Sequence, residues 1–213
     1  MTVTEARLHE TRTYSAPAGF AATANVTAEA YARAASDPTL FWEQAAERLD
    51  WAEPWHTAHE WDPSVGDAVP AARWFVGGQL NVAYNCVDRH VEAGRGDKVA
   101  LHFEGEPGDR IAVTYSDLQD RVSRAANALI ALGIRPGDRV VVYLPVLIET
   151  VVITLACARV GAVHSLVFGG FSAEAVRFRL ADTGAKLLVT SDGQFRRGLS
   201  LIHISEPTRL LSI

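Results

Sequence analysis

Two short segments of the chain carry residues that could bind an anionic ligand. The first is Phe168-Gly-Gly-Phe-Ser172, in which Gly169 and Gly170 leave an apolar run and enter a helical pattern. Without Cβ atoms the backbone there can approach a ligand closely, and the free N–H groups of a helix start favour an anion. The same glycine pair also fits a tight strand-to-helix turn that needs positive φ, and turn statistics favour that simpler interpretation.

The second segment is Arg196-Arg197-Gly198, which follows a predicted strand over residues 186–190. Two adjacent guanidinium groups suit phosphate binding, and ligands gather at the carboxyl edge of the strands in open α/β sheets. A solvated basic loop explains the same residues equally well.

Other chemistries that rely on short motifs find no support in the sequence. The chain has no Gly-x-x-x-x-Gly-Lys-Ser/Thr run and no Gly-x-Ser-x-Gly elbow. Gly94 and Gly96 lack the third glycine of a dinucleotide fingerprint, and they precede a predicted strand instead of following one. His56 and His59 are close in sequence, but the Trp-rich stretch around them suggests packing. We therefore predict neither a Rossmann dehydrogenase, nor a P-loop enzyme, nor a metal site.

The elements that must position the two segments alternate between strands and helices after Asp97. Apolar and β-branched runs predict strands, and apolar residues at helical spacing predict helices. Such alternation implies right-handed crossovers and a mostly parallel sheet, so the predicted fold class is α/β. The predicted strands cover residues 99–104, 111–115, 139–144, 163–168 and 186–190, and the predicted helices cover 116–129, 148–160 and 172–180.

Turn and cap residues set the ends of these elements. Pro107-Gly108-Asp109 predicts a hairpin between the first two strands. Ser116 and Gln119 have the spacing of a capping box at a helix start. The helices are predicted to end where a glycine permits a left-handed C-cap, at Gly133, Gly161 and Gly184.

The N-terminal third of the chain has a different pattern. Residues 1–27 show no firm periodicity and are predicted to form a mobile arm. Asp37-Pro38 starts a short amphipathic helix, and residues 80–91 form another. Between them, the stretch 51–75 holds four tryptophans and three prolines. It is predicted to be an irregular segment that packs as a belt on a larger body.

Composition excludes several classes of partner. The chain has 213 residues, 48% of them hydrophobic, a net charge of -5 and no cluster of Lys and Arg, so nucleic acid and anionic membranes are not expected. The longest apolar run, 140–160, is interrupted by Pro145 and Glu149 and does not predict a membrane span. Cys86 and Cys157 suggest neither a disulfide framework nor a metal site. We expect a cytoplasmic protein with small-molecule partners, since no secretory signal is recognisable.

Four ordered blocks of the sequence are long enough to be specific: WFVGGQLNVAYNCVDRH at 74–90, FEGEPGD at 103–109, LACARVGAVHS at 155–165 and FGGFS at 168–172. Together they resemble the N-terminal region of the acetyl-CoA synthetase family, the AMP-forming acetate–CoA ligases. The resemblance runs from about residue 24 to residue 198. It implies an acetyl-CoA synthetase N-terminal segment over 28–92 and, over 93–198, the first part of the adenylate-forming-enzyme large domain, which is the AMP-binding domain.

The resemblance also implies an activity and a site. The family makes an acyl-adenylate from acetate and Mg·ATP, releases pyrophosphate, and lets the CoA thiol displace AMP. Its CoA nucleotide lies against the Gly-Gly turn and an Arg-x-Gly-Arg/Lys loop. The CoA-binding residues implied here are Gly169, Gly170, Arg196, Arg197 and Gly198. The fourth position of that loop should be basic, and it is Leu199 in this chain.

No catalytic residue can be carried over, because the family's phosphate loop, acetate pocket and catalytic lysine all come later than residue 198. We therefore expect the chain to be inactive without the C-terminal part of its own enzyme. ATP, CoA and Mg²⁺ are the implied cofactors of the full-length family. Two other hypotheses stay open: a ligase for propionate or another short acyl group, and a non-catalytic CoA- or nucleotide-binding domain.

Residues 199–213 differ in composition from the rest of the chain. They contain no Ala, Gly or Val, whereas the preceding sequence is rich in Ala and Arg. Their sequence resembles the translation of a sequencing adapter that was read as part of the gene, so we predict that residues 199–213 are a non-native tail. A genuine C-terminal strand is the alternative.

Overall fold

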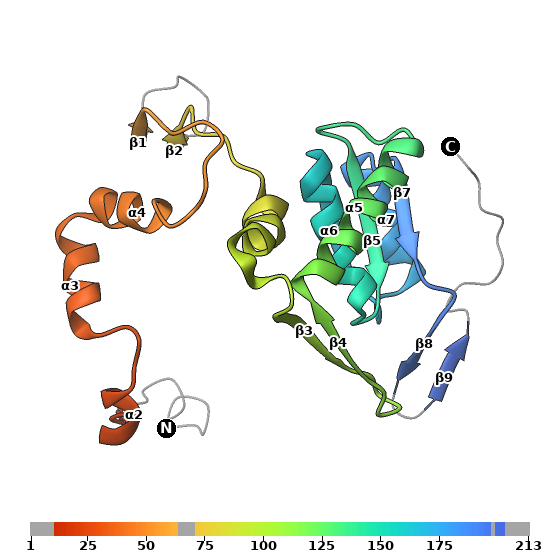
Figure 1. Ribbon diagram of the computed structural model, residues 1–213, viewed down its shortest axis with the longest axis horizontal. Helices are drawn as coiled ribbons and strands as arrows, with labels where there is room; N and C mark the ends of the chain where they lie inside the picture. Colours follow the sequence, from red (N-terminus) through yellow and green to blue (C-terminus); the bar gives the residue numbers. More distant parts are fainter. Residues whose placement is uncertain (1–10, 64–70, 197–198, 203–213) are drawn as a thin grey trace, which may run out of the picture. The chain divides into compact units, whose positions relative to one another are not determined.

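The computed structural model describes residues 11–63, 71–196 and 199–202 of the chain, with side chains described as far as residue 193 (Figure 1). Its contacts divide the chain into two compact units. The first unit comprises Met1–Arg48 and Thr57–Val76, and the second comprises Leu49–His56 and Gly77–Ile213.

From residue 11 onward, where the structure describes the chain, the first unit starts with three short helices. They are α2 (Ala18–Ala22), α3 (Ala28–Ser36) and α4 (Pro38–Ala46). The side chain of Asp37 accepts a hydrogen bond of 2.9 Å from the Leu40 N–H, and Pro38 occupies the first helical position. Both features stabilise a helix start, so the predicted start of α4 is confirmed. Helix α2 lies within the stretch predicted to be a mobile arm, and it has no buried residue.

Part of the aromatic-rich stretch pairs as two strands in the first unit, so the prediction of an irregular segment over 51–75 is wrong for residues 57–62 and 71–75, whereas residues 51–56 form neither a helix nor a named strand. Strands β1 (Thr57–Asp62) and β2 (Ala71–Val76) pair antiparallel. His59 lies opposite Trp74, and the two rings stack with centroids 4.3 Å apart. Such cross-strand ring pairs stabilise antiparallel strands. The prolines that argued against strands, Pro54, Pro63 and Pro70, all fall outside them.

The second unit begins with the segment Leu49–His56, which is hydrogen-bonded to the helix that contains Asn85. Asp50 N–H donates to Oδ1 of the buried Asn85, and Asn85 Nδ2 donates back to the Asp50 carbonyl, both at 2.9 Å. Within the same segment Trp51 and Trp55 make an edge-to-face contact with centroids 4.9 Å apart. The helix predicted over 80–91 is present and contains the wide turns η1 (Tyr84–Asp88) and η2 (Val91–Arg95).

A hairpin and a long helix follow. Strands β3 (Val99–Glu104) and β4 (Arg110–Thr114) pair antiparallel and lead into α5 (Tyr115–Ala131). The capping box predicted at Ser116 and Gln119 is wrong. Thr114 is the N-cap: its hydroxyl accepts from the Asp117 N–H at 3.1 Å, and the Asp117 carboxylate accepts from the Thr114 N–H. Gln119 instead donates to Asp88 at 2.8 Å, a tertiary contact that local sequence does not reveal.

The centre of the second unit is a parallel three-stranded sheet, which confirms the α/β prediction. The strands are β5 (Arg139–Leu144), β6 (Val163–Phe168) and β7 (Leu187–Thr190), in the order β6-β5-β7. Val141 of β5 pairs with Ser165 of β6 and with Leu188 of β7. Beyond β7, the strands β8 (Gly193–Arg196) and β9 (Leu199–Ile202) form a separate antiparallel pair.

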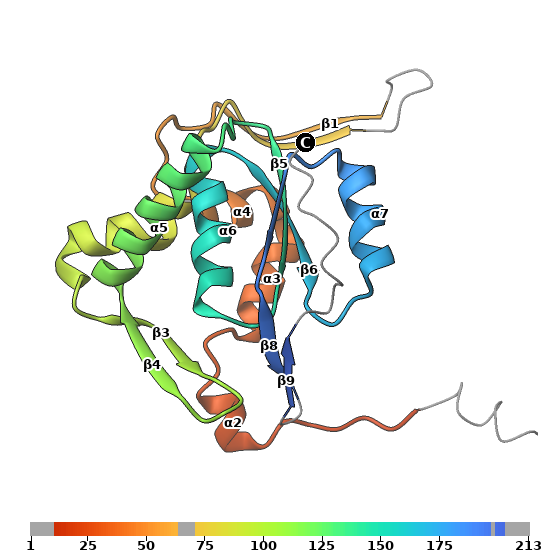
Figure 2. The ribbon, with the colours of Figure 1, turned by 90° about the vertical axis from the view of Figure 1, so that its right-hand side faces the viewer.

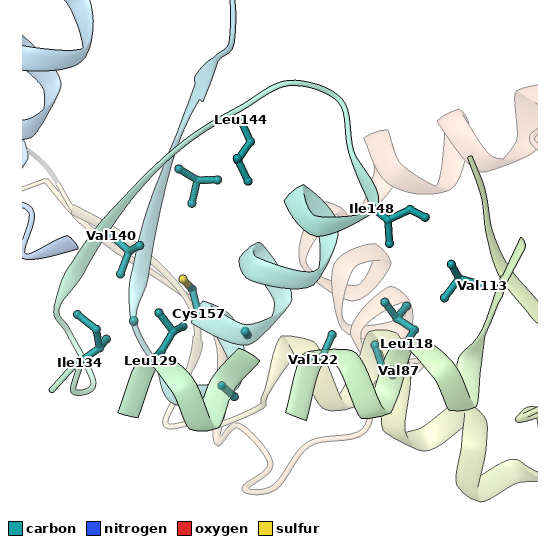
Figure 3. Packing of buried hydrophobic residues seen from close by; sticks show 14 residues of the cluster. Val87, Val113, Leu118, Val122, Leu129, Ile134, Val140, Leu144, Ile148 and Cys157 are labelled. Carbon is teal, nitrogen blue, oxygen red and sulfur yellow. The ribbon is translucent and has the colours of Figure 1, made fainter. Parts of the chain in front are cut away.

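Helices cover both faces of this sheet. Side chains alternate along β5: Val140, Val142 and Leu144 enter a core with α5 and α6 (Ile148–Val160). Figure 3 shows Val140 and Leu144 within this core. Val141 faces the other way and packs with Val167 and with α7 (Ala173–Thr183). Figure 2 shows α5 and α6 on one side of the strands and α7 on the other.

Glycines end these three helices as predicted. Each lies at positive φ, which is the left-handed region that only glycine adopts at low cost. The φ values are 87° at Gly133, 74° at Gly161 and 57° at Gly184.

The amino edge of the sheet is held together by charged side chains. Asp138, which is 8% exposed, accepts from the Arg135 N–H at 2.8 Å and pairs with Lys186 at 2.6 Å. The hydrogen bond from Lys186 and that from Arg135 hold the pKa of Asp138 below its ordinary value. Arg139 donates to the carbonyls of Thr183 and Gly184 at the end of α7. These contacts join the starts of β5 and β7 to the end of α7.

Several large apolar side chains of the second unit remain exposed. Leu166 is 57% exposed and Phe168 59% exposed on β6, which is an edge strand, and Phe178 of α7 is 66% exposed. Within the described residues, no helix is both long enough and apolar enough to cross a membrane.

Candidate functional site

The chain topology selects one edge of the sheet as the place for a ligand. β5 leads into α6 on one face, and its neighbour β6 leads into α7 on the opposite face. In open α/β sheets, ligands bind outside the carboxyl ends of two adjacent strands whose connections diverge in this way. Gly169 and Gly170 directly follow β6 and therefore lie at that position.

The two glycines form the middle of a β-turn. The Phe171 N–H donates to the Phe168 carbonyl at 3.0 Å and closes the turn. Neither Gly169 nor Gly170 is among the described residues with positive φ. Most residue types are compatible with a turn that has negative φ at both central positions. The interpretation that this turn needs glycine for its φ is therefore wrong.

The two glycines differ in exposure, which bears on why each position is occupied by glycine. Gly169 is buried, so packing can account for the lack of a side chain there, whereas Gly170 is exposed. Among the described residues, none accepts a hydrogen bond from the Gly170 N–H. Position 170 thus offers a bare backbone surface and a donor at the carboxyl edge of the sheet, which fits close approach by a ligand.

Four side chains hold this turn, and two of them, Tyr143 and Arg179, lie outside the segments that the sequence singles out. The Tyr143 hydroxyl of β5 lies 2.8 Å from the Phe171 carbonyl oxygen and 3.4 Å from that of Gly169, so its proton is donated to Phe171. The Phe168 and Phe171 rings meet edge to face, with centroids 6.3 Å apart. The Arg179 guanidinium of α7 lies over the Phe171 ring, 5.3 Å from its centroid.

The start of α7 is a poorer anion site than its sequence suggests. The Ser172 hydroxyl accepts from the Ala175 N–H at 3.3 Å and so occupies one donor of the first turn. Glu174 lies in that turn and pairs with Arg177 at 2.7 Å. The hydrogen bond from Arg177 lowers the pKa of Glu174, which keeps its carboxylate charged. An anionic ligand at the helix start would meet this negative charge, so the positive charge has to come from elsewhere.

The predicted arginines are placed only in part. Ser191 and Asp192 join the end of β7 to β8, so β8 starts at the carboxyl edge of the sheet, and Figures 1 and 2 show it extending beyond that edge. The backbone of Arg196 ends β8 and pairs with Leu199. Arg197 and Gly198 lie outside the described residues.

The described side chains also bear on whether a metal ion could bind to this part of the chain. In the part of the chain that the structure describes, no group of three or more His, Cys, Asp or Glu side chains could hold a metal ion. Groups that coordinate Mg²⁺ are carboxylate and carbonyl oxygens, commonly together with substrate phosphates.

Comparison with known proteins shows which sequence families match the chain. Residues 87–209 match the sequence model of the AMP-binding enzymes, and residues 27–86 match that of the acetyl-coenzyme A synthetase N-terminus. The relatives that bear the name acetyl-coenzyme A synthetase include proteins from three different bacterial genera. The relative from Streptomyces avermitilis is 59% identical over 90% of this chain and 28% of its own length. The values are 56%, 87% and 19% for Mycolicibacterium smegmatis, and 52%, 90% and 28% for Gemmatimonas aurantiaca. The chain thus spans less than a third of the length of these relatives.

Proposed function

The chain belongs to the family of AMP-binding enzymes, and on that premise we propose that it is the N-terminal part of an acetate–CoA ligase. The ligase converts acetate, ATP and CoA into acetyl-CoA, AMP and pyrophosphate through an acetyl-adenylate. The observation that carries the proposal is the succession of the two family matches along one chain, at 52–59% identity to the acetyl-coenzyme A synthetases named above.

Within this ligase, the Gly169-Gly170 turn and the Arg196-Arg197-Gly198 segment receive the nucleotide of CoA. The turn lies at the switch point of the sheet, and Gly170 is exposed and does not have the positive φ that would require glycine. The arginines supply the charge that the phosphates of CoA require and that the start of α7 lacks. Leu199 follows where a further basic residue would add to that charge.

The adenylating groups lie in further polypeptide. Phosphoryl and adenylyl transfer need positive groups preorganised around the phosphates, and Mg²⁺ bound with ATP supplies part of that charge. The described residues contain no metal-holding cluster, and the chain covers 28% of the Streptomyces avermitilis relative. The exposed side chains of Leu166 and Phe168 on β6, an edge strand of the described sheet, give such polypeptide apolar groups to pack on. The ligase works in the cytoplasm, where ATP and CoA are present.

Titration of the 213-residue protein tests this assignment. Isothermal titration should show binding of CoA and no binding of acetate. A separate pyrophosphate assay should show no acetate-dependent release of pyrophosphate from ATP. Gly170→Val should abolish most CoA binding, because the new side chain occupies the surface on which the nucleotide rests. Gly19→Val is the matched control, since Gly19 also has no positive φ and a Cβ atom added there would meet nothing within 4 Å. Pyrophosphate release at the rate of a complete ligase would contradict the assignment of the adenylating groups.

A stand-alone CoA-binding module is the second candidate. It would need only the features proposed above for the nucleotide of CoA, the Gly169-Gly170 turn and the Arg196-Arg197-Gly198 segment, and this chain contains both. The two hypotheses differ in what they predict of the gene. If the chain is the start of a ligase, the reading frame continues into a Ser/Thr/Gly-rich phosphate loop.

Sequencing of the gene through codon 199 also tests the proposed non-native tail. We expect the genuine reading frame to depart from the present sequence near that codon. An unbroken frame into the same residues 199–213 would refute the proposal. The AMP-binding match runs to residue 209, and β9 pairs with β8, so part of the tail is compatible with the domain.

A further inference from the structure

The turn that carries Gly169 and Gly170 needs an external restraint if it is to bind a ligand. Glycine loses more conformational freedom on ordering than any other residue, so two adjacent glycines form an intrinsically mobile segment. A mobile binding surface loses affinity, because binding must then order it. The closing hydrogen bond from Phe171 N–H to the Phe168 carbonyl is local and does not by itself tie the turn to the neighbouring strand β5 or to α7.

Tyr143 supplies the first restraint. It lies on β5 opposite Val167 of β6, on the face that packs against α7. Its hydroxyl reaches past the end of β6 and donates to the Phe171 carbonyl at 2.8 Å. Both polar groups of the Phe171 backbone are therefore engaged, the N–H within the turn and the carbonyl with the central strand of the sheet.

Arg179 supplies the second restraint. Its guanidinium covers the Phe171 ring at 5.3 Å, while the Phe168 ring meets the same ring edge to face. The Arg179 Nε is buried and has no hydrogen-bond partner among the described residues, so the aromatic face is the contact that accommodates this cation. Phe171 is thereby fixed from β5, from β6 and from α7.

We propose that Tyr143 and Arg179 are positioning residues for CoA: acting through Phe171, they hold the Gly169-Gly170 turn in the conformation that receives the nucleotide. This inference rests on the proposed function, because that function supplies the ligand. Neither residue needs to touch CoA. Their effect is to order the turn before the ligand arrives, so their loss should raise the dissociation constant without removing any contact to the ligand.

The restraint itself can be tested without CoA. Amide hydrogen exchange of the segment 168–172 should become about five-fold faster in Tyr143→Phe, since that variant loses one hydrogen bond of ordinary strength. Tyr84→Phe is the matched control. It also loses a hydroxyl hydrogen bond, the 2.7 Å contact to Glu92, but far along the sequence from the turn. Exchange at 168–172 should be unchanged in the control.

The consequence for ligand binding is tested with two probes, CoA and adenosine 3′,5′-bisphosphate. Tyr143→Phe and Arg179→Ala should each weaken both probes by about three- to ten-fold, from the usual strengths of a hydrogen bond and a cation–π contact. Arg179→Lys should restore binding to within about two-fold, because an ammonium group can also lie over the ring. Arg124→Ala, which removes an exposed arginine of α5, is the control and should bind like the unaltered chain.

The outcomes separate the inference from the proposed function. If the unaltered, folded chain binds neither probe, the CoA site is refuted and the inference falls with it. If the unaltered chain binds both probes but Tyr143→Phe and Arg179→Ala bind them equally well, the positioning role alone is overturned. Unchanged exchange at 168–172 in Tyr143→Phe overturns it as well.

Discussion

The charged cluster around Asp88 should be the most sensitive point of the second unit. Arg159 of α6 donates to both carboxylate oxygens of Asp88, at 2.8 and 2.7 Å, and also to the Ser123 hydroxyl at 3.0 Å. Gln119 of α5 donates to the same carboxylate at 2.8 Å. The side chains of Asp88 and Arg159 are 14% and 25% exposed. One carboxylate thus joins η1 to both helices of the core.

The substitution Asp88→Ala removes this acceptor and leaves a largely buried guanidinium without its partner. Breaking a buried ion pair costs about 3–5 kcal/mol, and we expect the lower end, about 3 kcal/mol, because a quarter of Arg159 remains exposed. Asp88→Asn retains one acceptor oxygen, so it should cost about 1.5 kcal/mol. For a chain of this size, 3 kcal/mol corresponds to a decrease in Tm of about 6–12 °C.

Urea and thermal unfolding followed by far-ultraviolet circular dichroism measure these differences. Asp120→Ala is the control, because it removes an ion pair with Arg124 in which both side chains are more than half exposed. Such a pair contributes about 0–0.5 kcal/mol. The reasoning is refuted if Asp88→Ala unfolds within about 0.5 kcal/mol of the control, since the buried network would then contribute no more than a surface pair.

Three further outcomes follow from other contacts. The hydrogen bond from Lys186 lowers the pKa of Asp138. The stability that the ionised Asp138 contributes is therefore complete at pH values above its ordinary pKa of 3.8, and it is lost as the pH falls through the lower pKa of the folded state. Asp138→Asn should therefore flatten the loss of stability between neutral and acid pH, and equal acid sensitivity of both proteins would contradict this. Burial raises the pKa of Cys157 to about 11, so a thiol reagent at pH 8 should modify only the exposed Cys86 until the chain unfolds. Labelling of both cysteines in the native protein, measured by mass spectrometry, would disprove this expectation. Gly161→Ala should cost about 1–2 kcal/mol because φ is 74°, whereas Gly19→Ala, with an ordinary φ and open space, should be neutral or slightly stabilising in the same unfolding assay.

The sequence predicts the parallel sheet and its helices well because their signals are local. The observed bounds of β5, α6 and β6 equal the predicted ranges 139–144, 148–160 and 163–168. Strands covered on both faces are continuous apolar runs, and a glycine at a helix end fixes the next boundary to within a residue. The same signals place the Gly169-Gly170 turn at the carboxyl edge of the sheet.

What the sequence did not predict depends on contacts between distant residues. Thr114 and Ser116 both begin a capping-box spacing, and the choice between them follows from Gln119 being bound to Asp88. Likewise the role of Tyr143 depends on a carbonyl 28 residues away. One signal was present: Tyr143 is the only hydroxyl-bearing residue in the 139–144 strand, and a buried tyrosine hydroxyl needs a partner.

The positions of the tryptophans determine what intrinsic fluorescence can report. None lies in the parallel sheet or its helices, so tryptophan emission would not follow the melting of that core directly. The edge-to-face pair Trp51–Trp55 lies in the segment 49–56 of the second unit, which Asn85 holds through hydrogen bonds to Asp50. A change in emission that precedes the circular dichroism transition would therefore signal release of this segment, or opening of the first unit, while the sheet is still intact. The five tryptophans are Trp42, Trp51, Trp55, Trp61 and Trp74.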